Sequence, residues 1–579
     1  MQLDVVNFFG GCEEPIEERV VDSGSSLPPE VEEGNVEYKL KLVDPSKCRF
    51  EHLVTQMKWR LEEGHGEAIY QIGVEDSGMM TGLDDDELRA SLATLGRMAE
   101  RLGASVSVLR RCSVESDAAE ASKYTAEALV RKVPNDQKFL DVRVAVLGAV
   151  ESGKSTLIGV LTHGEMDNGR GRSRLNLFRH LHEIQSGRTS SISHEILGFN
   201  SRGEVVNYSE SRSAEEICKS ASKLVTFVDL AGHHRYMRTT IFGLTCYRPD
   251  FAMLVVSANA GLIGTAREHL GFAVALGIPV CVVMTKVDVC TPTMTQKAID
   301  QVTHILQLPG CNKNPIVVKT EADVIRTAYT FKQESITPIF IVSNVTGHNL
   351  ELLYSFLNLV PSVNSAAEQE KLEQEALEFQ VDETFSVPET GTVVGGKVLR
   401  GAVRLGDKAL IGPQDNGMFS PITIGSVHRN RSPCRFARAG QAATLALLDT
   451  KRSCLRKGMV ILSREQKKPR ACWRFESEIF MLYHNSVLRP GFEATVHVGG
   501  VMQTARVTRI YNEEQALKTG NKGQIELAFI KQPEYLTPNA RLLFRGGQFK
   551  AIGQVKRVLH GEEGLGAEQR RRAHRHSVP

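Results

Sequence analysis

The stretch that decides the fold of this chain reads Gly148-Ala149-Val150-Glu151-Ser152-Gly153-Lys154-Ser155-Thr156. An apolar run at residues 142–147 comes directly before it, and apolar residues follow it. This order predicts a buried strand, a glycine turn and a helix that a lysine opens, which is the phosphate-loop pattern G-x-x-x-x-G-K-[ST]. The glycines let the backbone wrap a polyphosphate, so that N–H groups and the helix N-terminus point at it. The sequence therefore predicts a site for a nucleoside triphosphate.

Two side chains of the loop have a specific part in the predicted site. Lys154 is expected to reach the β and γ phosphates, and the Ser155 hydroxyl is expected to bind Mg²⁺ as the cofactor. The residues expected around the phosphates are Gly148, Ala149, Val150, Glu151, Ser152, Gly153, Lys154, Ser155, Thr156 and, further along the chain, Gly232.

A second apolar strand, at residues 224–228, ends in Asp229-Leu230-Ala231-Gly232. An aspartate at such a strand end can hold a Mg²⁺-bound water. A glycine three residues later can turn its backbone N–H to the γ-phosphate. Asp229 is therefore a second predicted metal ligand, beside Ser155.

Two more apolar strands end in residues that favour guanine over adenine. The strand at 280–284 ends in Thr285-Lys286-Val287-Asp288, and the strand at 339–342 ends in Ser343-Asn344-Val345-Thr346-Gly347. The Asp288 carboxylate can accept both N–H donors on the guanine edge, a donor pair that adenine lacks, while the Lys286 stem lies along the base. We therefore expect GTP and GDP as ligands, with a guanine site made of Thr285, Lys286, Asp288, Ser343, Asn344 and Val345.

The set of motifs resembles the one in translational GTPases of the elongation factor Tu and elongation factor 1-alpha type. Residues 229–236 resemble the D-C-P-G-H-A-D-Y stretch of elongation factor Tu. Residues 390–398 and 405–407 resemble the β-barrel that follows its GTP-binding domain. The resemblance covers roughly residues 35–560.

Within that superfamily the chain is similar to the branch that contains GTP-binding proteins 1 and 2. Of these two groups, GTP-binding protein 2 is the more similar. The stretches that carry this similarity are residues 168–171, 187–192 and 232–236. Two departures from the superfamily pattern stand in the nucleotide motifs. Thr285 occupies the usual asparagine position of N-K-x-D, which predicts a looser tie between base loop and phosphate loop. Glu151-Ser152 replaces Asp-His or Asp-Ser and adds a methylene beside the nucleotide.

The resemblance implies a third Mg²⁺ ligand in switch I, the long basic segment at residues 160–195. Thr189 is the implied ligand, and it would leave the ion when the γ-phosphate is lost. Neighbouring hydroxyls can take the same role, and the sequence leaves open which one does; they are Ser190, Ser191 and Ser193.

The resemblance also implies a catalytic residue. His233 follows Gly232 and is implied to orient the attacking water once its imidazole is pushed inward. The competing candidate is the adjacent His234. As a hypothesis, Val150 acts with a residue near Ile192 as an apolar gate that keeps His233 outside until a partner arrives.

Composition restricts the class of protein. At 579 residues the chain is too long for one core, and three to five domains are expected. A net charge of +2 offers no global basic field for nucleic acid. Eleven cysteines without a C-x-x-C pair argue against a disulfide framework or a zinc site and for the reducing cytoplasm. The acidic N-terminus does not resemble a signal peptide, and no apolar stretch is long enough to cross a membrane.

The predicted fold class is an α/β phosphate-loop GTPase domain with a mostly parallel, doubly wound sheet, followed by two β-barrels and preceded by a small α/β domain. Alternating residues at 105–108 predict that the small domain has an antiparallel sheet with one solvated face. The predicted boundaries are a disordered segment at 1–35, an accessory α/β domain at 36–134, the GTP-binding domain at 139–361, a linker at 362–376, β-barrels at 377–465 and 467–560, and a basic disordered tail at 561–579.

The resemblance implies a monomeric GTPase that acts with the ribosome, in surveillance or rescue of stalled ribosomes, together with a release-factor-like partner. Two other interpretations remain open: a nucleotide-gated scaffold with weak hydrolysis in mRNA turnover, and an aminoacyl-tRNA carrier. Contact with tRNA or mRNA is therefore undecided. A candidate RNA footprint, which can equally be a charged outer strand face, consists of His428, Arg429, Asn430, Arg431, Arg435, Phe436 and Arg438.

Overall fold

The computed structural model describes residues 19–21, 27–31, 34–114, 123–132 and 140–559, except 179, 309, 332–334, 362–365, 389, 430–431, 449, 466–468, 485 and 548. The predicted disorder at 1–35 falls mostly outside the described residues, and the predicted tail at 561–579 falls wholly outside them. Contacts divide the chain into two compact units. The first comprises Met1–Leu140, Phe199–Val205 and Ser220–Lys223, and the second comprises the remainder.

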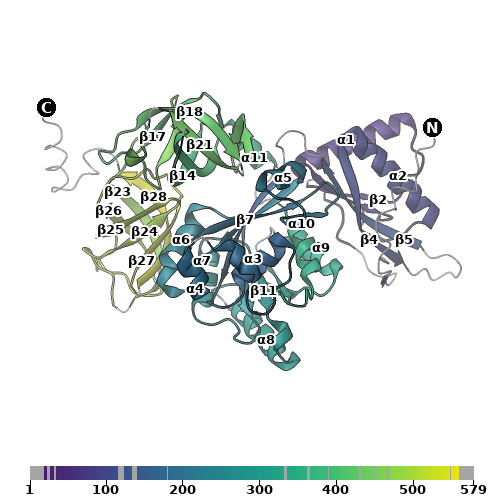
Figure 1. Ribbon diagram of the computed structural model, residues 1–579, viewed down its shortest axis with the longest axis horizontal. Coiled ribbons are helices and arrows are strands. Elements are labelled where there is room, and N and C mark those ends of the chain that lie inside the picture. Colours follow the sequence, from purple (N-terminus) through teal and green to yellow (C-terminus); the bar gives the residue numbers. More distant parts are fainter. Residues whose placement is uncertain are drawn as a thin grey trace. The chain divides into compact units, whose positions relative to one another are not determined.

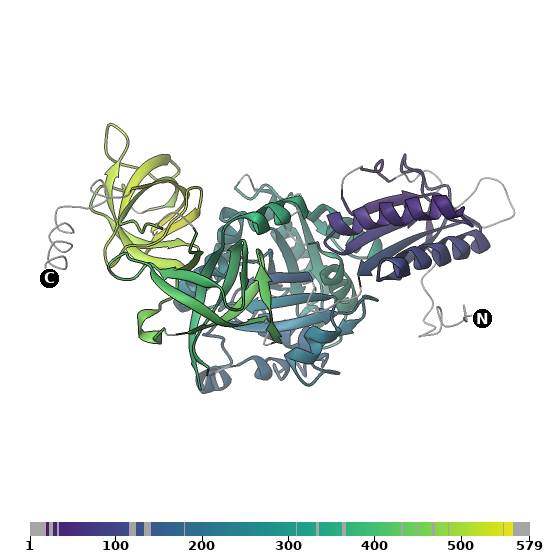
Figure 2. The same cartoon turned by 90° about the horizontal axis from the view of Figure 1, so that it is seen from above.

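The first unit is a two-layer α/β fold. Helices α1 (Lys47–Glu63) and α2 (Asp85–Arg101) pack together on one face of its sheet, as Figure 2 shows. On α1 the apolar Leu53, Met57 and Leu61 recur every four residues and form one buried stripe. The sheet has the order β1-β4-β5-β3-β2. Its strands are β1 (Arg19–Val21), β2 (Val36–Lys39), β3 (Glu67–Ile72), β4 (Ala104–Val114) and β5 (Lys123–Lys132).

The predicted antiparallel pairing is wrong for part of this sheet. Strand β5 pairs antiparallel with β3 and β4, whereas β2 pairs in parallel with β3 and β1 pairs in parallel with β4. The reason is the 17-residue helix α1 between β2 and β3, because a long crossover lets two successive strands run in the same direction.

The predicted solvated face is also wrong for the central strands. On β3, Glu67 points away from the face that packs on the helices, because successive side chains alternate between faces. Arg131 of β5 pairs with Glu67 at 2.7 Å and donates to the Asn200 carbonyl at 3.0 Å. Lys223 lies 3.8 Å from the same glutamate. Two segments from far along the chain therefore cover this face, and alternation within one strand does not reveal them.

The second unit contains an eight-stranded sheet of order β12-β13-β11-β10-β6-β9-β7-β8. Strand β10 pairs in parallel with β6 and β11, and β13 pairs in parallel with β11 and β12. Strands β9, β7 and β8 lie on one side of β6 and β10, β11, β13 and β12 on the other, and the helices lie on both faces of the sheet, as Figures 1 and 2 show. The strands are β6 (Leu140–Gly148), β7 (Ser193–Phe199), β8 (Val205–Val206), β9 (Lys223–Asp229), β10 (Phe251–Ser257), β11 (Val280–Thr285), β12 (Asn314–Val317) and β13 (Ile336–Ile341).

These features confirm the predicted doubly wound, mostly parallel sheet. Strand β6 is buried from residue 142 to 148, which explains its apolar run; the one charged residue in it, Arg143, donates to the Tyr247 carbonyl at 3.0 Å. Switch I contains the short helices η2 (Ser173–Leu177) and α4 (Leu181–Ser186). The longer helices of this part are α3 (Lys154–His163), α5 (Ala214–Ser220), α6 (Met237–Cys246), α7 (Thr265–Ala275), α8 (Pro292–Gln307), α9 (Glu321–Thr330) and α10 (Leu350–Leu359).

Two β-barrels follow, as predicted. In the first, β17 pairs with both β22 and β18, which closes the ring β17-β22-β14-β15-β21-β18. The second is the closed barrel β23-β26-β25-β24-β27-β28. The first ring contains β14 (Glu378–Val387), β15 (Gly391–Arg400), β17 (Lys408–Gly412), β18 (Ser420–Arg429), β21 (Ala442–Leu448) and β22 (Val460–Ser463). The second contains β23 (Arg474–Tyr483), β24 (Glu493–Val498), β25 (Val501–Ile510), β26 (Lys522–Phe529), β27 (Arg541–Gly546) and β28 (Phe549–Leu559).

The stretch predicted as a linker contains helix α11 (Ala366–Gln374). Its residues are mainly Glu, Gln, Lys and Ala, which are good helix formers. Within the described part of the chain, no helix combines the length and the apolar character that crossing a bilayer requires.

Candidate functional site

The phosphate loop joins β6 to α3, and its glycines are required by close backbone contacts. A Cβ on Gly148 would lie 2.2 Å from the Val255 carbonyl oxygen, and Gly148 has a φ of +143°. Gly153 caps the N-terminus of α3 in the left-handed region, at a φ of +88°. The first helical N–H groups of α3 therefore open onto the pocket that the loop surrounds, which suits an anion.

Lys154 is buried at the floor of this pocket. Its ammonium donates to the Ala149 carbonyl at 2.7 Å. Burial lowers the pKa of Lys154 to about 8, and the nearby Asp229 carboxylate opposes that shift. A Cβ on Gly232 would lie 2.7 Å from the Ala149 carbonyl oxygen, a backbone atom, so only glycine fits there without a shift of the loop. A buried cation beside unpaired helical N–H groups is the environment in which a phosphate is bound strongly.

Three oxygen-bearing side chains meet beside the lysine. The Ser155 hydroxyl donates to Asp229 Oδ2 at 2.5 Å and lies 2.8 Å from the Thr189 hydroxyl, which itself lies 3.5 Å from Asp229 Oδ2. The other oxygen, Asp229 Oδ1, is buried without a hydrogen-bond partner. Burial raises the pKa of Asp229 to about 6, against the opposing effect of Lys154. Hard oxygen donors and an orphaned carboxylate oxygen fit Mg²⁺ well.

The geometry separates Thr189 from the neighbouring hydroxyls. Ser190 and Ser191 both donate to the Glu183 carboxylate, at 2.7 and 3.0 Å from their side-chain oxygens. The Ser193 hydroxyl is buried without a hydrogen-bond partner. Of these four residues, only Thr189 lies within hydrogen-bonding distance of Ser155. We therefore keep Thr189 as the candidate ligand.

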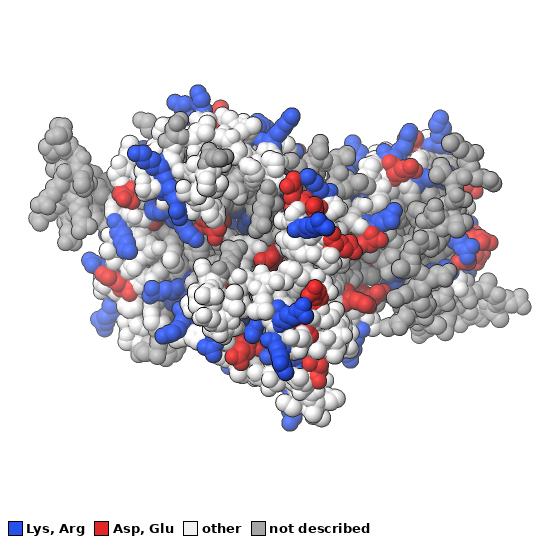
Figure 3. Space-filling view, viewed as in Figure 1, with Lys and Arg blue, Asp and Glu red and all other residues white. Residues whose placement is uncertain are grey.

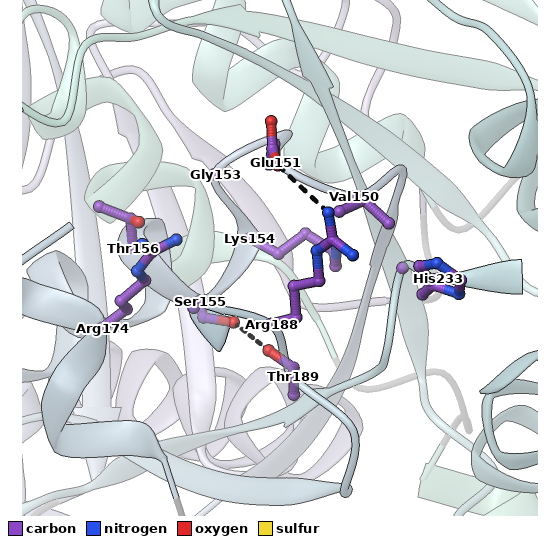
Figure 4. Close-up of a pocket in the computed structure, with 12 residues that line it drawn as sticks. Val150, Glu151, Gly153, Lys154, Ser155, Thr156, Arg174, Arg188, Thr189 and His233 are labelled. Carbon is purple, nitrogen blue, oxygen red and sulfur yellow. Dashed lines mark hydrogen bonds and ion pairs between the residues drawn. The ribbon is translucent and has the colours of Figure 1, made fainter. Parts of the chain in front are cut away.

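His233 lines the same pocket, and Figure 4 shows its ring turned away from Lys154. Its Nδ1 accepts the backbone N–H of Arg235 at 3.1 Å. In the neutral imidazole this bond leaves the proton on Nε2, which can then donate to a water or a phosphate oxygen. His234 is exposed and does not line the pocket.

The geometry agrees with the gate hypothesis for Val150 but not for Ile192. Val150 lines the pocket that contains His233. Ile192 instead lines a separate cavity and packs against the core of the α/β sheet. The structure therefore does not place the two apolar side chains around one opening.

The base side of the site is formed where β11 and β13 end. The buried Thr285 hydroxyl donates to the Ser152 carbonyl at 2.7 Å. The base loop and phosphate loop are thus linked by one hydrogen bond, although threonine replaces the usual asparagine. The Asp288 carboxylate accepts from Ser343 Oγ at 2.7 Å, and that same Oγ accepts the Val345 N–H at 3.2 Å. Asp288 itself is exposed.

Lys286 and Asn344 complete the predicted guanine set. Lys286 has a left-handed backbone with a φ of +61°, which turns the chain after β11. Asn344 is buried, and its side-chain oxygen lacks a hydrogen-bond partner. Its backbone carbonyl accepts the Asp167 N–H at 2.8 Å, which ties the base loop to switch I.

Sequence reasoning missed four residues near the phosphate loop. Arg174 and Arg188 of switch I line the pocket, and Arg188 lies 4.0 Å from the Glu151 carboxylate. The cluster of arginines in switch I was the available signal for this pair. His269 of α7 accepts the Gly148 N–H at 3.3 Å, and burial lowers the pKa of His269 to about 3. The local sequence does not indicate the contact of His269, because its partner Gly148 lies 121 residues away. The fourth residue, Glu183, lies only seven and eight residues from the serines that donate to it, but no motif marks that turn.

The candidate RNA footprint is only partly on the surface. Arg429 is 5% exposed, so it is unsuited to an RNA contact. Arg438 lies 3.4 Å from Glu373 and stacks over Phe436, while Arg435 is exposed. Asn430 and Arg431 lie outside the described residues. On the face in Figure 3, positive and negative side chains are interspersed, without one continuous basic surface.

A second cavity lies between the α/β sheet and the two barrels, within the second unit. Its volume is about 520 Å³. Two cations, Arg238 of α6 and Lys457, contribute to its wall. The full lining comprises His180, Ser191, Ile192, Arg238, Thr239, Phe242, Tyr247, Glu383, Lys457, Gly500 and Met502.

Two family models match the chain. Residues 141–362 match the elongation factor Tu GTP binding domain, and residues 391–462 match elongation factor Tu domain 2. GTP-binding protein 2 of Mus musculus is 59% identical over 533 residues, which are 92% of this chain and 88% of that protein. GTP-binding protein 1 of Xenopus laevis is 45% identical over 92% of this chain and 80% of that protein.

A solved structure shows the same fold. Translation elongation factor SelB of Methanococcus maripaludis, in complex with a GTP analogue, superposes with a TM-score of 0.52 at 17% identity, over 73% of this chain and 80% of that one. The phosphate loop, the strand-end motifs and the identity over most of the chain agree with one another. The chain therefore belongs to the translational GTPases of the elongation factor Tu type, in the branch of GTP-binding proteins 1 and 2, and its chemistry is the hydrolysis of GTP.

Proposed function

We propose that this protein is a Mg²⁺-dependent GTPase which the ribosome stimulates and which serves in the surveillance or rescue of stalled ribosomes. The observation that carries the proposal is the meeting of Ser155, Thr189 and Asp229 beside the buried Lys154. This is the donor set that a Mg²⁺–GTP complex requires. Membership of the translational GTPases supports the ribosome as activator. The branch resemblance supports a release-factor-like partner, a cytoplasmic location and a monomeric state.

Each residue has a distinct part in the proposed reaction. Lys154 and the N–H groups of the phosphate loop, with that of Gly232, bind the phosphate oxygens. Ser155, Thr189 and Asp229 would hold a Mg²⁺ ion, which would supply positive charge to the β and γ phosphates. The Nε2–H of His233 orients the attacking water after the ring turns inward.

The first test is GTP turnover by the purified protein at physiological salt, with and without ribosomes. We expect ribosomes to raise the rate strongly, because the His233 ring has to turn before it can reach a water. The matched control is Lys154→Ala, which should be inactive under both conditions. Slow turnover that ribosomes do not change would favour a nucleotide-gated scaffold in mRNA turnover.

The hypothesis of an apolar gate has its own test. If Val150 holds the His233 ring outside the pocket, Val150→Gly should raise the basal rate and reduce the stimulation by ribosomes. Val150→Ile keeps an apolar side chain and serves as the control. An unchanged basal rate in Val150→Gly would count against the gate.

The cavity beside the barrels favours a second candidate function, an aminoacyl-tRNA carrier. Arg238 and Lys457 supply positive charge to a cavity of about 520 Å³, and a charged lining suits a terminal nucleotide of RNA. Filter binding of aminoacyl-tRNA with GTP and with GDP tests it. Retention of aminoacyl-tRNA that requires GTP and that Lys457→Glu abolishes would establish the carrier function. Equal retention of deacylated and aminoacylated tRNA would exclude it.

A further inference from the structure

We infer that Glu183 is a positioning residue for the Mg²⁺ site: its carboxylate holds switch I so that Thr189 faces Ser155 and Asp229 before GTP arrives. The inference rests on the proposed role of Thr189 as a ligand. It starts from a glutamate that is 1% exposed on α4, a helix whose other residues are largely exposed.

One oxygen of this carboxylate collects four hydrogen bonds. Glu183 Oε1 accepts the backbone N–H groups of Ser190 and Ser191 at 2.7 and 2.9 Å, and their hydroxyls at 2.7 and 3.0 Å. Glu183 Oε2 accepts the backbone N–H of His180 at 3.2 Å. Hydrogen bonds to an ionised acceptor are roughly twice as strong as neutral ones. The carboxylate therefore joins the start of α4 to the segment immediately after Thr189.

The position of that segment decides where Thr189 points. Ser190 is the next residue, so fixing its N–H fixes the peptide plane that leaves Thr189. The Thr189 hydroxyl then lies 2.8 Å from Ser155 Oγ and 3.5 Å from Asp229 Oδ2. A loop that is already ordered loses less conformational entropy when the ion and the γ-phosphate arrive. Glu183 should thus favour the GTP-bound state over the GDP-bound state, because Thr189 is expected to leave the ion when the γ-phosphate is absent.

Helix α4, which contains Glu183, contributes little to the apolar core of the protein. On α4, Leu181 is 70% exposed and Ile184 is 50% exposed, so the helix buries little apolar surface. Loss of the carboxylate would break the cap of α4 and a buried hydrogen-bond network, so some stability is lost, although the apolar core is untouched. A selective loss of affinity for the GTP analogue over GDP is what separates a positioning role from a merely structural one.

The test compares Glu183→Gln with wild type by the dissociation constants of fluorescent GDP and of a fluorescent non-hydrolysable GTP analogue, across a Mg²⁺ series. We expect affinity for the GTP analogue at saturating Mg²⁺ to fall about tenfold, with GDP affinity changed less than about twofold. The Mg²⁺ concentration at half-maximal GTP-analogue binding should rise. Gln185→Ala, an exposed change on the same helix, is the matched control and should behave as wild type.

A second variant keeps the inference testable if Glu183→Gln folds poorly. Ser190→Ala with Ser191→Ala removes two of the four donors and retains the carboxylate, so about a threefold loss of GTP-analogue affinity is expected. Equal losses for GDP and the GTP analogue, or an unchanged Mg²⁺ midpoint, would overturn the inference. These assays contain no ribosomes, so a failure of ribosomal stimulation leaves their result intact, and the two failures are distinguishable.

Discussion

The two sides of the nucleotide site are built in different ways. The base side stands on buried strand ends: Thr285 and Ser343 are 0% exposed and connect the base loop to the phosphate loop and to Asp288. The switch side consists of segments with exposed or half-buried side chains, such as Arg188 and His233. The difference teaches that the proposed guanine site is preformed, whereas the proposed catalytic histidine has to be turned into place. Base-side changes should therefore act on affinity for GDP and GTP alike, and a change at His233 should act on turnover.

The largest effect is expected at Lys154, because this residue is proposed to bind the phosphates that lie between the base side and the switch side of the site. Lys154→Ala removes a buried cation from the phosphate loop, and the other cations that line the pocket, Arg174 and Arg188, belong to switch I, so nucleotide affinity should fall by roughly a thousandfold. Equilibrium binding of fluorescent GDP measures it, and Lys154→Arg is the control that retains charge. Binding within tenfold of wild type would contradict the proposed phosphate site.

On the switch side, His233→Ala should lower the ribosome-stimulated kcat by about a hundredfold, because a positioned general acid or base contributes on that order. Affinity for the GTP analogue should stay within about twofold, since the ring points away from Lys154. Single-turnover hydrolysis on ribosomes measures the rate. His234→Ala is the control, and if it alone abolished turnover, the catalytic role would belong to His234.

On the base side, Asp288→Asn should exchange the preferred base. An amide in place of the carboxylate presents a donor to the guanine N–H groups, so affinity for GDP should fall by about thirtyfold and affinity for xanthosine diphosphate should rise. Competition binding with both nucleotides reads the exchange. The kcat measured with saturating xanthosine triphosphate should equal the kcat of the wild type with GTP. A lower kcat would show that the base side also affects hydrolysis.

The smallest effect is expected at Thr285. Thr285→Val keeps the shape and removes the hydrogen bond to the Ser152 carbonyl, so nucleotide affinity should fall about fivefold. Thr285→Ser retains the hydroxyl and should restore most of the affinity. Dissociation rates of fluorescent GDP distinguish the two variants. If Thr285→Val and Thr285→Ser released GDP at the same rate, the hydrogen bond between base loop and phosphate loop would contribute nothing to nucleotide affinity.

The sequence also predicted most of the architecture, and its errors have one cause. The doubly wound sheet and both barrels follow from apolar runs and turn residues, which are local signals. The parallel pairs in the first unit and the cover on its second face were missed, because Asn200 and Lys223 come from far along the chain. Arg429 looked like a surface cation for the same reason: it is buried close to Asp141 and Cys218, which come from far along the chain.

The sequence by itself determined that the chain binds a guanine nucleotide. Glycines at tight turns, Lys154 at a helix start and Asp288 at a strand end are local requirements of backbone geometry and hydrogen bonding, and they leave a pattern in order and spacing. Only the tertiary structure decided which switch I hydroxyl meets Ser155 and Asp229, and that Glu183 holds the neighbouring serines. The first choice depends on contacts between residues that lie 34 and 74 positions apart. The second depends on the turn that brings Glu183 back to serines seven and eight residues later, and both arrangements exist only once the chain has folded.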